Sequence, residues 1–400
     1  VVEFYQSLEI VASTITISIG DSLADFLKSA DFPNHSLIAK SESGVGKIYK
    51  GINTFEFLEL AINELSEKGE KLILELLNEV SVLPYLVEQG VVTAGEKVII
   101  EILTGGVSNT VLAVTTNDRN MVLKQALPEL KVAEKWEADQ RRAIVEADAL
   151  RLFHELSPKQ VPNLVFIDPI QFVLIMDRVQ LDSTVWKSDL LDGRFDLNVA
   201  KVLGETLATW HLYGESNPAK IAQFKEDTLF EQLRVDPFYR FVAKQNPDLQ
   251  TVIGGLINEL ETEHTTIVHG DFSPKNIMVS PSGQVYVLDF EVMHIGNPVF
   301  DLAFLVAHLL CKFFRAENEQ VASQLAALAT SFLDAYEKMH AISPSLALHT
   351  ALISLARVEG KSPVNYLNPA EQEKLQAFTK SVLSDSKITN ARDLFDLSKR

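Results

Sequence analysis

The segment from Ile267 to Glu291 constrains this chain more than any other stretch. Two apolar runs rich in β-branched residues, Ile277–Ser280 and Val285–Leu288, flank the triplet Pro281-Ser282-Gly283. Proline and glycine supply the backbone angles of a tight turn, so the segment predicts a short β-hairpin. Such a hairpin brings the residues before its first strand close to those after its second strand.

Polar side chains stand on both sides of this predicted hairpin. Phosphoryl transfer needs one carboxylate to orient the attacking hydroxyl, and an amide and a second carboxylate to hold Mg²⁺ on the nucleotide phosphates. Asp271 and Asn276 have the five-residue spacing of the protein-kinase loop H-R-D-x-x-x-x-N, and Asp289 opens D-F-E where those kinases have D-F-G. The alternative is a surface hairpin with polar ends, which requires four constrained positions to coincide by chance.

The strings H-G-D-F-S-P-K-N and L-D-F-E resemble the aminoglycoside phosphotransferase family, which also holds choline, homoserine and methylthioribose kinases. The resemblance covers residues from about 82 to the C-terminus. It implies an α+β, two-lobed, protein-kinase-like fold with a small β-rich N-lobe and a larger helical C-lobe. It also implies that Asp271 is the catalytic base in a loop shared with His269, and that Asn276 and Asp289 bind magnesium.

A glycine-containing turn precedes these motifs in the chain. Strands are predicted at Lys97–Leu103 and Val111–Thr115, and the turn between them could lay backbone amides over phosphates. Most Gly-Gly hairpins are structural, so the assignment depends on the motifs that follow. The candidate nucleotide-binding residues of this turn are Gly105, Gly106, Ser108 and Asn109.

Lys124 lies inside the apolar strand predicted at Met121–Gln125. A lysine in a central strand usually points to solvent, but the kinase layout makes it the residue that contacts the α- and β-phosphates. Its partner would be Glu146 on the helix predicted at Ala138–Leu156; a solvated helix glutamate is the alternative. This region also resembles the methylthioribose kinase branch of the family, in the stretch V-L-K-Q-A-L-P, in Trp136 and in R-x-x-x-E-A. The chain departs from that branch at two positions. The branch carries D-P-E where this chain has D-F-E with Phe290, and a residue other than asparagine at the position of Asn276.

The run Phe172–Val179 is an apolar strand that turns polar at its end. In the kinase layout it is the hinge between the lobes, with Met176 against the adenine and Asp177 and Val179 beside it. An ordinary buried strand is the alternative.

The acceptor is predicted to be a small molecule. Asp301 follows Asp289 by only twelve positions, and a buried helix is predicted at Leu302–Phe314, so no protein-kinase activation segment fits between them. Asp301 is expected to cap that helix or to brace the catalytic loop. Further helices are predicted at Phe195–Tyr213, Thr251–Glu263, Gln320–His340, Ser345–Arg357 and Pro369–Ser384. Candidate acceptor contacts are Glu291, His294 and Glu359, the last with a solvated loop as its alternative.

The sequence is predicted to divide into an N-terminal αβ segment of unknown role (1–81), an N-lobe (82–179) and a C-lobe (180–400). In the first part, a strand is expected at Ile10–Ile19, and helices at Asp21–Ala30 and within Phe55–Val80. Ser43-Gly44-Val45-Gly46-Lys47 is a glycine-rich turn and not a P-loop, because Ser41 and Ile48 break that motif.

Bulk composition narrows the function classes. The net charge of −18 argues against a nucleic-acid binder; it suits a cationic substrate, or solubility alone. The single cysteine, Cys311, favours a reducing compartment, and neither a membrane span nor a secretory signal is evident, so the cytoplasm is expected. The sequence therefore predicts transfer of the γ-phosphoryl group of ATP or GTP to a small-molecule hydroxyl. The alternatives are a methylthioribose or other sugar kinase, and a non-catalytic nucleotide-binding protein.

Overall fold

The computed structural model describes residues 9–11, 14–17, 36–39, 47–50, 72–103, 108–128, 139–385 and 387–399. The chain divides into two compact units. The first comprises residues 1–144 and 164–178, and the second comprises residues 145–163 and 179–400. The three-part division predicted from the sequence stays a prediction.

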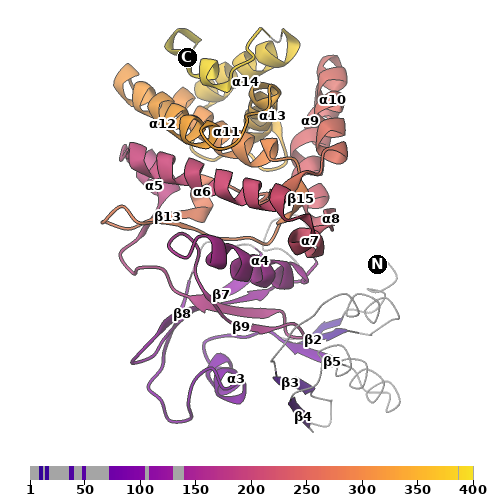
Figure 1. Cartoon of the computed structure of the whole chain (residues 1–400), viewed down its shortest axis with the longest axis vertical. Helices are drawn as coiled ribbons and strands as arrows, with labels where there is room; N and C mark the ends of the chain where they lie inside the picture. Colours follow the sequence, from indigo (N-terminus) through magenta and orange to yellow (C-terminus); the bar gives the residue numbers. More distant parts are fainter. Residues whose placement is uncertain are drawn as a thin grey trace. The chain divides into compact units, whose positions relative to one another are not determined.

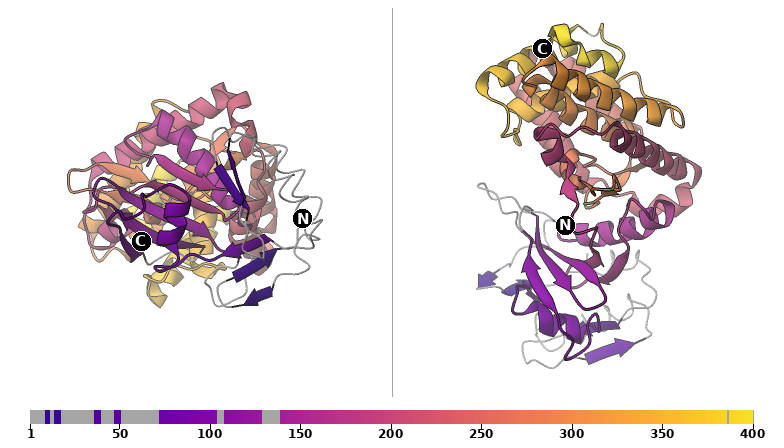
Figure 2. Two further views of the ribbon diagram at one scale, coloured as in Figure 1. Left: turned by 90° about the horizontal axis from the view of Figure 1, so that it is seen from below. Right: turned by 90° about the vertical axis from the view of Figure 1, so that its left-hand side faces the viewer.

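A five-stranded antiparallel sheet in the order β6-β7-β8-β10-β9 forms the centre of the first unit (Figure 2). Its strands are β6 (Ile99–Ile102), β7 (Asn109–Thr115), β8 (Asn120–Ala126), β9 (Leu164–Asp168) and β10 (Val173–Asp177). The three strands predicted around Lys124 are thus confirmed, as is the apolar strand that ends at Asp177. Because β8 is the middle strand, Lys124 has a paired strand on each side.

The short helix α3 (Val82–Glu88) covers one face of this sheet. Its apolar residues Val82 and Leu86 join one buried cluster with Leu123 of β8 and Ile175 of β10. Burial of each such side chain contributes about 1.5–3 kcal/mol. Side chains alternate across a strand, so the neighbours of these residues along β8 and β10 lie on the opposite face.

The N-terminal strands differ from the prediction. β1 (Glu9–Val11) and β2 (Thr14–Ile17) pair antiparallel, so the single strand expected at Ile10–Ile19 is wrong. β2 also pairs with β5 (Leu72–Glu75), where a helix was expected; β-branched and leucine residues fit either period in so short a run. β3 (Ser36–Ala39) pairs with β4 (Lys47–Lys50). The helix expected at Asp21–Ala30 and residues 43–46 lie outside the described residues.

The second unit is largely helical (Figure 1). Its long helices are α4 (Arg142–Leu156, which begins in the first unit), α6 (Leu197–Ser216), α10 (Gln250–Thr262), α11 (Val299–Arg315), α12 (Glu319–Glu337), α13 (Leu346–Glu359) and α14 (Pro369–Ser384). Its short helices include α5 (Trp186–Leu191), α7 (Pro218–Ile221), α8 (Thr228–Phe230) and α9 (Phe241–Gln245). These observations confirm the helices predicted for the C-lobe.

Helix α11 is the core of this unit. Residues 299–314 are all buried, as expected of a helix that other elements surround. α6 packs closely on α12: a Cβ added at Gly204 would lie 2.3 Å from the carbonyl oxygen of Phe332. α4 joins the same core, because Phe153 stacks on Trp210 of α6 with ring centroids 4.0 Å apart. This packing gives the site below a rigid support.

Candidate active site

The predicted hairpin is present and closes as expected. β13 (Ile277–Val279) pairs with β14 (Val285–Val287), and Gly283 takes a φ of +80° in the turn between them. The backbone N–H of Leu288 donates to the carbonyl of Asn276 at 2.9 Å. Asn276 is therefore opposite Leu288, and Asp289 follows directly, so the polar ends of the two strands come together.

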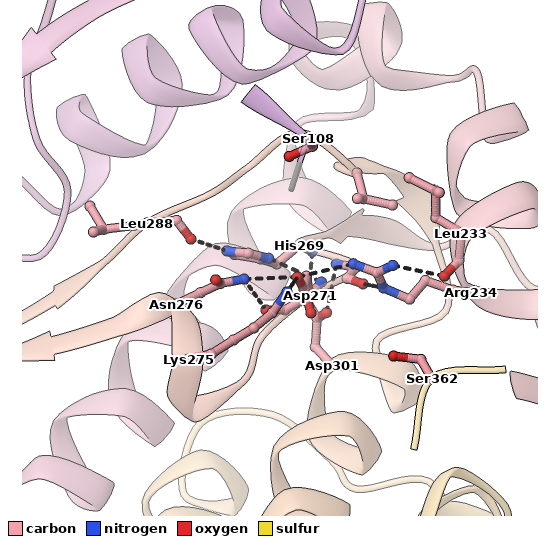
Figure 3. A network of polar contacts seen from close by, with 12 residues as sticks. Ser108, Leu233, Arg234, His269, Asp271, Lys275, Asn276, Leu288, Asp301 and Ser362 are labelled. Carbon is pink, nitrogen blue, oxygen red and sulfur yellow. Dashed lines mark hydrogen bonds and ion pairs between the residues drawn. The ribbon is translucent and has the colours of Figure 1, made fainter. Parts of the chain in front are cut away.

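Asp271 is the centre of a polar network in this unit (Figure 3). Its Oδ2 accepts from three groups: Arg234 Nη2 at 3.0 Å, Lys275 Nζ at 2.8 Å and Asn276 Nδ2 at 2.9 Å. The residue is 3% exposed. Burial alone would raise the pKa of this carboxyl group, but the charges of Arg234 and Lys275 outweigh it and lower the pKa. Asp271 is accordingly a carboxylate at neutral pH.

Asp301 braces the backbone of the catalytic loop, which was one of the two predicted roles. Its Oδ2 accepts the N–H of His269 at 2.7 Å and its Oδ1 accepts the N–H of Gly270 at 2.9 Å. The capping role is wrong, because α11 begins two residues earlier at Val299. Gly270 takes a φ of +74°, a left-handed conformation that favours glycine. The carboxylate and the glycine together fix the path of the loop into Asp271.

His269 connects this loop to the hairpin. Its Nδ1 accepts from the N–H of Asp271 at 3.1 Å, which leaves Nε2–H to donate to the carbonyl of Leu288 at 3.3 Å. Burial lowers the pKa of His269 against the pull of nearby carboxylates, so the ring is neutral. These contacts give His269 a positioning role, and we do not propose it as an acid or base.

A buried histidine on α6 extends the support of Asp301. His211 Nε2 lies 3.3 Å from Asp301 Oδ2, and its Nδ1 lies 2.8 Å from the hydroxyl oxygen of Tyr336. His211 is fully buried, and its burial lowers its pKa. The residue is a packed histidine.

Asn276 and Asp289 have the chemistry of magnesium ligands. Both hydrogen bonds of the Asn276 side chain use Nδ2, so the amide oxygen is the atom that would bind a cation. Asp289 has a φ of +72°, a strained conformation of the kind that gathers at functional sites. Within the described residues, no three His, Cys, Asp or Glu side chains form a metal cluster. One or two protein oxygens completed by substrate phosphates is the usual magnesium arrangement, and these residues fit it.

In the first unit, Lys124 is paired with Val111 of β7 and with Leu174 of β10. It is 7% exposed and lies on the face of the sheet opposite the α3 cluster. Met176 of β10 is opposite Val122 and lies on the same face as Lys124. The predicted phosphate and adenine contacts thus share one side of the sheet.

The predicted glycine turn is only partly described. Gly105 and Gly106 lie outside the described residues, whereas Ser108 directly precedes β7 and Asn109 is its first residue. The carbonyl of Ser108 accepts hydrogen bonds from Leu127 N–H at 3.0 Å and from the guanidinium of Arg142. Arg142 is buried and also donates to the carbonyl of Leu127 at 2.7 Å. Sequence reasoning missed this arginine, which ties the turn to the start of α4.

The other predicted nucleotide residues lie close, along the sequence, to the points where the chain passes from one unit to the other. Asp177 ends β10 and accepts from Arg119 at 3.2 Å, and Val179 is the first residue of the second unit after the crossing. Glu146 is buried on α4. The convergence of Lys124 and Glu146 with Asp271 stays a prediction.

The three predicted acceptor contacts differ in their burial and in the residues that they contact. Glu291 is buried two residues after Asp289. His294 is on β15 (His294–Gly296), stacked on Phe230 with centroids 4.0 Å apart, and burial lowers its pKa to about 4. Glu359 accepts from Asn246 and, at 2.6 Å, from Gln376. His294 and Glu359 thus have partners within the fold, and their role as acceptor contacts stays a prediction.

Sequence reasoning also missed Arg234, which contacts the catalytic loop at both Gly270 and Asp271. It lies on the π-helix η3 (Glu231–Arg240), and its Nε donates to the carbonyl of Gly270 at 2.6 Å. π-Helical turns are frequent at functional sites, but nothing in the local sequence marks this one except Pro237 within it.

Among the described residues, no helix is both long and apolar enough to cross a bilayer. The expected cytoplasmic location stays a prediction.

The chain is similar in sequence to methylthioribose kinases. The chain is 26% identical to the methylthioribose kinase of Bacillus cereus (strain B4264) over 275 residues, which are 61% of this chain and 68% of that protein. The methylthioribose kinase of Bacillus thuringiensis (strain Al Hakam) gives 26% identity over 276 residues, with the same coverage.

A solved structure shares the fold. The amicoumacin kinase hAmiN, solved in complex with AMP-PNP, Ca²⁺ and Ami, superposes with a TM-score of 0.52 at 13% identity, covering 80% of this chain and 97% of that one. This likeness, together with the sheet and the helical unit, confirms the α+β, two-lobed kinase-like fold.

The model of one protein family, described as the phosphotransferase enzyme family, matches residues 99–342, which is more than half of the chain. The match includes the β-sheet around Lys124, the catalytic loop and α11. The chain therefore belongs to the phosphotransferase enzyme family, as its motifs predict, and it is a small-molecule kinase.

Proposed function

We propose that this kinase transfers the γ-phosphoryl group of ATP, or of GTP, to a hydroxyl group of a small molecule, with Asp271 as the catalytic base. The observation that carries the proposal is the setting of Asp271. Its Oδ2 accepts from Arg234, Lys275 and Asn276, while Asp289 comes to the same end of the hairpin. A buried carboxylate held in one orientation beside an amide and a second carboxylate is the arrangement that phosphoryl transfer requires.

The geometry also selects the oxygen that acts as the base. Because the three donors engage Oδ2, Oδ1 is the oxygen that would accept the proton of the acceptor hydroxyl. The lowered pKa of Asp271 makes it a weak base, so proton transfer would be late, after the bond to the γ-phosphorus has begun to form. Arg234 and Lys275 orient the carboxylate and keep it ionised.

Asn276 and Asp289 would hold Mg²⁺, which when bound offsets the negative charge of the β- and γ-phosphates. Lys124 would contact the α- and β-phosphates, with Glu146 orienting its ammonium group. Lys124 and Met176 lie on one face of the sheet, which supports a single nucleotide spanning both contacts. Ser108, Asn109, Asp177 and Val179 remain proposed nucleotide contacts, and Glu291 a proposed acceptor contact.

The substitution Asp271→Asn tests this mechanism. It keeps the shape of the side chain but removes the base, so we expect magnesium-dependent turnover to fall by about 10²–10⁴-fold. Asp334→Asn is the matched control, because Asp334 lies on the surface of α12 in an ion pair with Arg392 at 2.6 Å. Equal turnover by Asp271→Asn and the control would refute the assignment of the base.

A methylthioribose kinase is the second candidate, and the 26% identity to the Bacillus kinases favours it. The chain departs from that branch at Phe290 and Asn276. Direct assay with methylthioribose, alongside other sugars, choline, homoserine and aminoglycosides, separates it from other acceptors. Magnesium-dependent ATP hydrolysis, even without an acceptor, distinguishes all of these from a protein that binds nucleotide without turnover.

A further inference from the structure

A group of basic side chains gathers in the second unit, although the chain as a whole has a net charge of −18. They come from α5, the catalytic loop, η3, α11 and α13, and we call them the cationic cluster. Its members are Lys187, Arg234, Lys275, His308, Lys312 and Arg357. Two of them, Arg234 and Lys275, are the residues that hold Asp271.

The far end of the cluster surrounds one aromatic ring. Lys312 Nζ lies 3.5 Å from the hydroxyl oxygen of Tyr366 and 5.0 Å from the centroid of its ring. Lys187 Nζ lies 5.8 Å from the same centroid. Lys312 is 2% exposed and donates to the carbonyl of His308 at 3.2 Å. Two ammonium groups therefore share a single tyrosine, and one of them is deeply buried.

Aromatic contacts connect this end of the cluster to Asp271. The Arg234 guanidinium, which pairs with Asp271, also lies 5.6 Å from the ring centroid of Phe304. The ring of His308 is 5.3 Å from that of Phe304. Phe304, His308 and Lys312 follow at four-residue spacing and so line one face of α11. The cluster thus runs along this helix face, starting at the catalytic carboxylate.

Arg357 extends the cluster from α13. Its guanidinium lies 5.4 Å from the ring centroid of Phe238 and donates to Ser362 Oγ at 3.1 Å. Phe238 in turn packs on Phe304, with centroids 5.5 Å apart. The Nε of Arg357 is buried and has no hydrogen-bond partner among the described residues.

These charges are poorly compensated. Within the described part of the chain, Lys187, Lys312 and Arg357 form no ion pair with a carboxylate. Burial, with smaller contributions from Lys187 and Arg357, lowers the pKa of Lys312 to about 7, and Cys311 acts in the opposite direction. Burial and then Arg357, Lys312, Lys275 and Lys187 lower the pKa of His308. Arg234 and Lys275 are paired with Asp271, and the lowered pKa of His308 leaves its ring neutral, so the basic groups without a carboxylate partner are Lys187, Lys312 and Arg357. Buried charges are normally paired, and an anion bound beside these three groups would pair with them and favour the protonated form of Lys312.

We propose that the cationic cluster binds an anionic substituent of the acceptor, a carboxylate or a phosphate, while the acceptor's hydroxyl reaches Asp271. The inference rests on the proposed function. The acceptor hydroxyl oxygen forms the new bond to the γ-phosphorus, the bond from that phosphorus to the bridging oxygen of the nucleoside diphosphate breaks, and Asp271 takes the hydroxyl proton. The substrate class is thus a hydroxy acid or a phosphorylated alcohol, rather than a cationic aminoglycoside or choline.

The test compares acceptors that share a carbon skeleton and differ in charge. Glycerol, glycerate, glycerol phosphate and 3-amino-1,2-propanediol form one set; glucose, gluconate, glucose 6-phosphate and glucosamine form another. We expect kcat/KM for an anionic member to exceed that of its neutral counterpart by tenfold or more, which is the discrimination expected from one well-placed charge pair. The carboxylate and phosphate members decide which of the two anions is preferred.

The variants Lys312→Met and Lys187→Met then locate the preference. Each should reduce the ratio of anionic to neutral kcat/KM by about tenfold, while KM for ATP is unchanged. Lys201→Met, an exposed position on α6 paired with Glu205, is the control and should change neither value. Circular dichroism checks that the Lys312 variant is folded, and the half-buried Lys187 provides an independent variant.

Binding calorimetry with Mg²⁺ and AMP-PNP repeats the comparison without turnover. The proposal is overturned if no anionic member binds or reacts, if a neutral or cationic member is preferred, or if the variants change KM for ATP instead. In each of these cases, magnesium-dependent ATP turnover that still requires Asp271 would leave the proposed function standing. Loss of the proposed function would instead appear as wild-type protein without such turnover.

Discussion

Replacing Asp301 by asparagine tests whether a single carboxylate fixes the catalytic loop. The side chain is fully buried, and its two oxygens accept the N–H groups of His269 and Gly270 at 2.7 and 2.9 Å. Asparagine keeps one acceptor, but its NH₂ group must face the other backbone N–H. A hydrogen bond to a charged group contributes about 1.5–3 kcal/mol, and a buried donor without a partner costs about 1–3 kcal/mol. We therefore expect the free energy of unfolding to fall by about 3 kcal/mol.

Urea denaturation, followed by the fluorescence of Trp186 and Trp210, measures this change in the second unit, where both indoles are buried. Asp334→Asn is the matched control; Asp334 is half-exposed, so its replacement should change stability by no more than about 0.5 kcal/mol. Turnover should also fall in Asp301→Asn at temperatures where the protein is folded, because the loop that carries Asp271 loses its anchor. Unfolding curves that coincide for the two variants would refute the bracing role.

Three further predictions follow from individual residues. Gly270→Ala should lower the melting temperature and turnover, because its Cβ would lie 2.8 Å from the carbonyl oxygen of Val292 at a φ of +74°. Gly254→Ala is the control, because a Cβ at this position on α10 meets no other atom, and it should stabilise the protein by about 0.5–1 kcal/mol. Equal melting temperatures for the two variants would contradict the argument. Cys311 is buried with its pKa raised to about 11, so a thiol reagent should label it only in denaturant; rapid labelling of the native protein would show that α11 is not packed as described. The pKa of Lys312 falls from 10.5 to about 7 on folding, so between these pH values the unfolded chain binds more protons than the folded protein. The free energy of unfolding should therefore rise with pH, by up to about 1.4 kcal/mol per pH unit. Denaturation measured from pH 7 to 10 should show this rise in the wild type and not in Lys312→Met.

Local signals in the sequence were sufficient for the elements around the site. The hairpin was predicted from β-branched runs around Pro281 and Gly283, and its register places Asn276 opposite Leu288 as the argument required. The long helices α6 and α10 to α14 were predicted because their apolar periodicity extends over several turns. Bracing of the catalytic loop was one of the two roles predicted for Asp301.

Local sequence signals do not predict the partners of Asp271 that are distant from it in the sequence. Arg234 precedes Asp271 by more than thirty residues and reaches it from a π-helix, a form that has no periodic signature. The hydrogen bonds of Glu359 with Asn246 and Gln376 likewise join separate elements, and its predicted contact with the acceptor stays a prediction. Both outcomes depend on which helices meet, which residue types alone do not specify.

The net charge of the chain also fails to indicate the charge of the acceptor, because the charges close to the site differ from the total. The net charge of −18 allows a cationic acceptor, but exposed carboxylates farther away than a Debye length of about 8 Å are largely screened in physiological salt. Lys312 and Arg234 are buried or nearly so, and their fields are screened much less. The potential felt by a substrate beside Asp271 is therefore set by buried groups nearby, which are the cationic cluster, the carboxylates of Asp271 and Asp301, and the phosphates of the nucleotide. An acidic protein can in this way select an anionic acceptor, and the preference should persist in salt that abolishes any effect of the surface carboxylates.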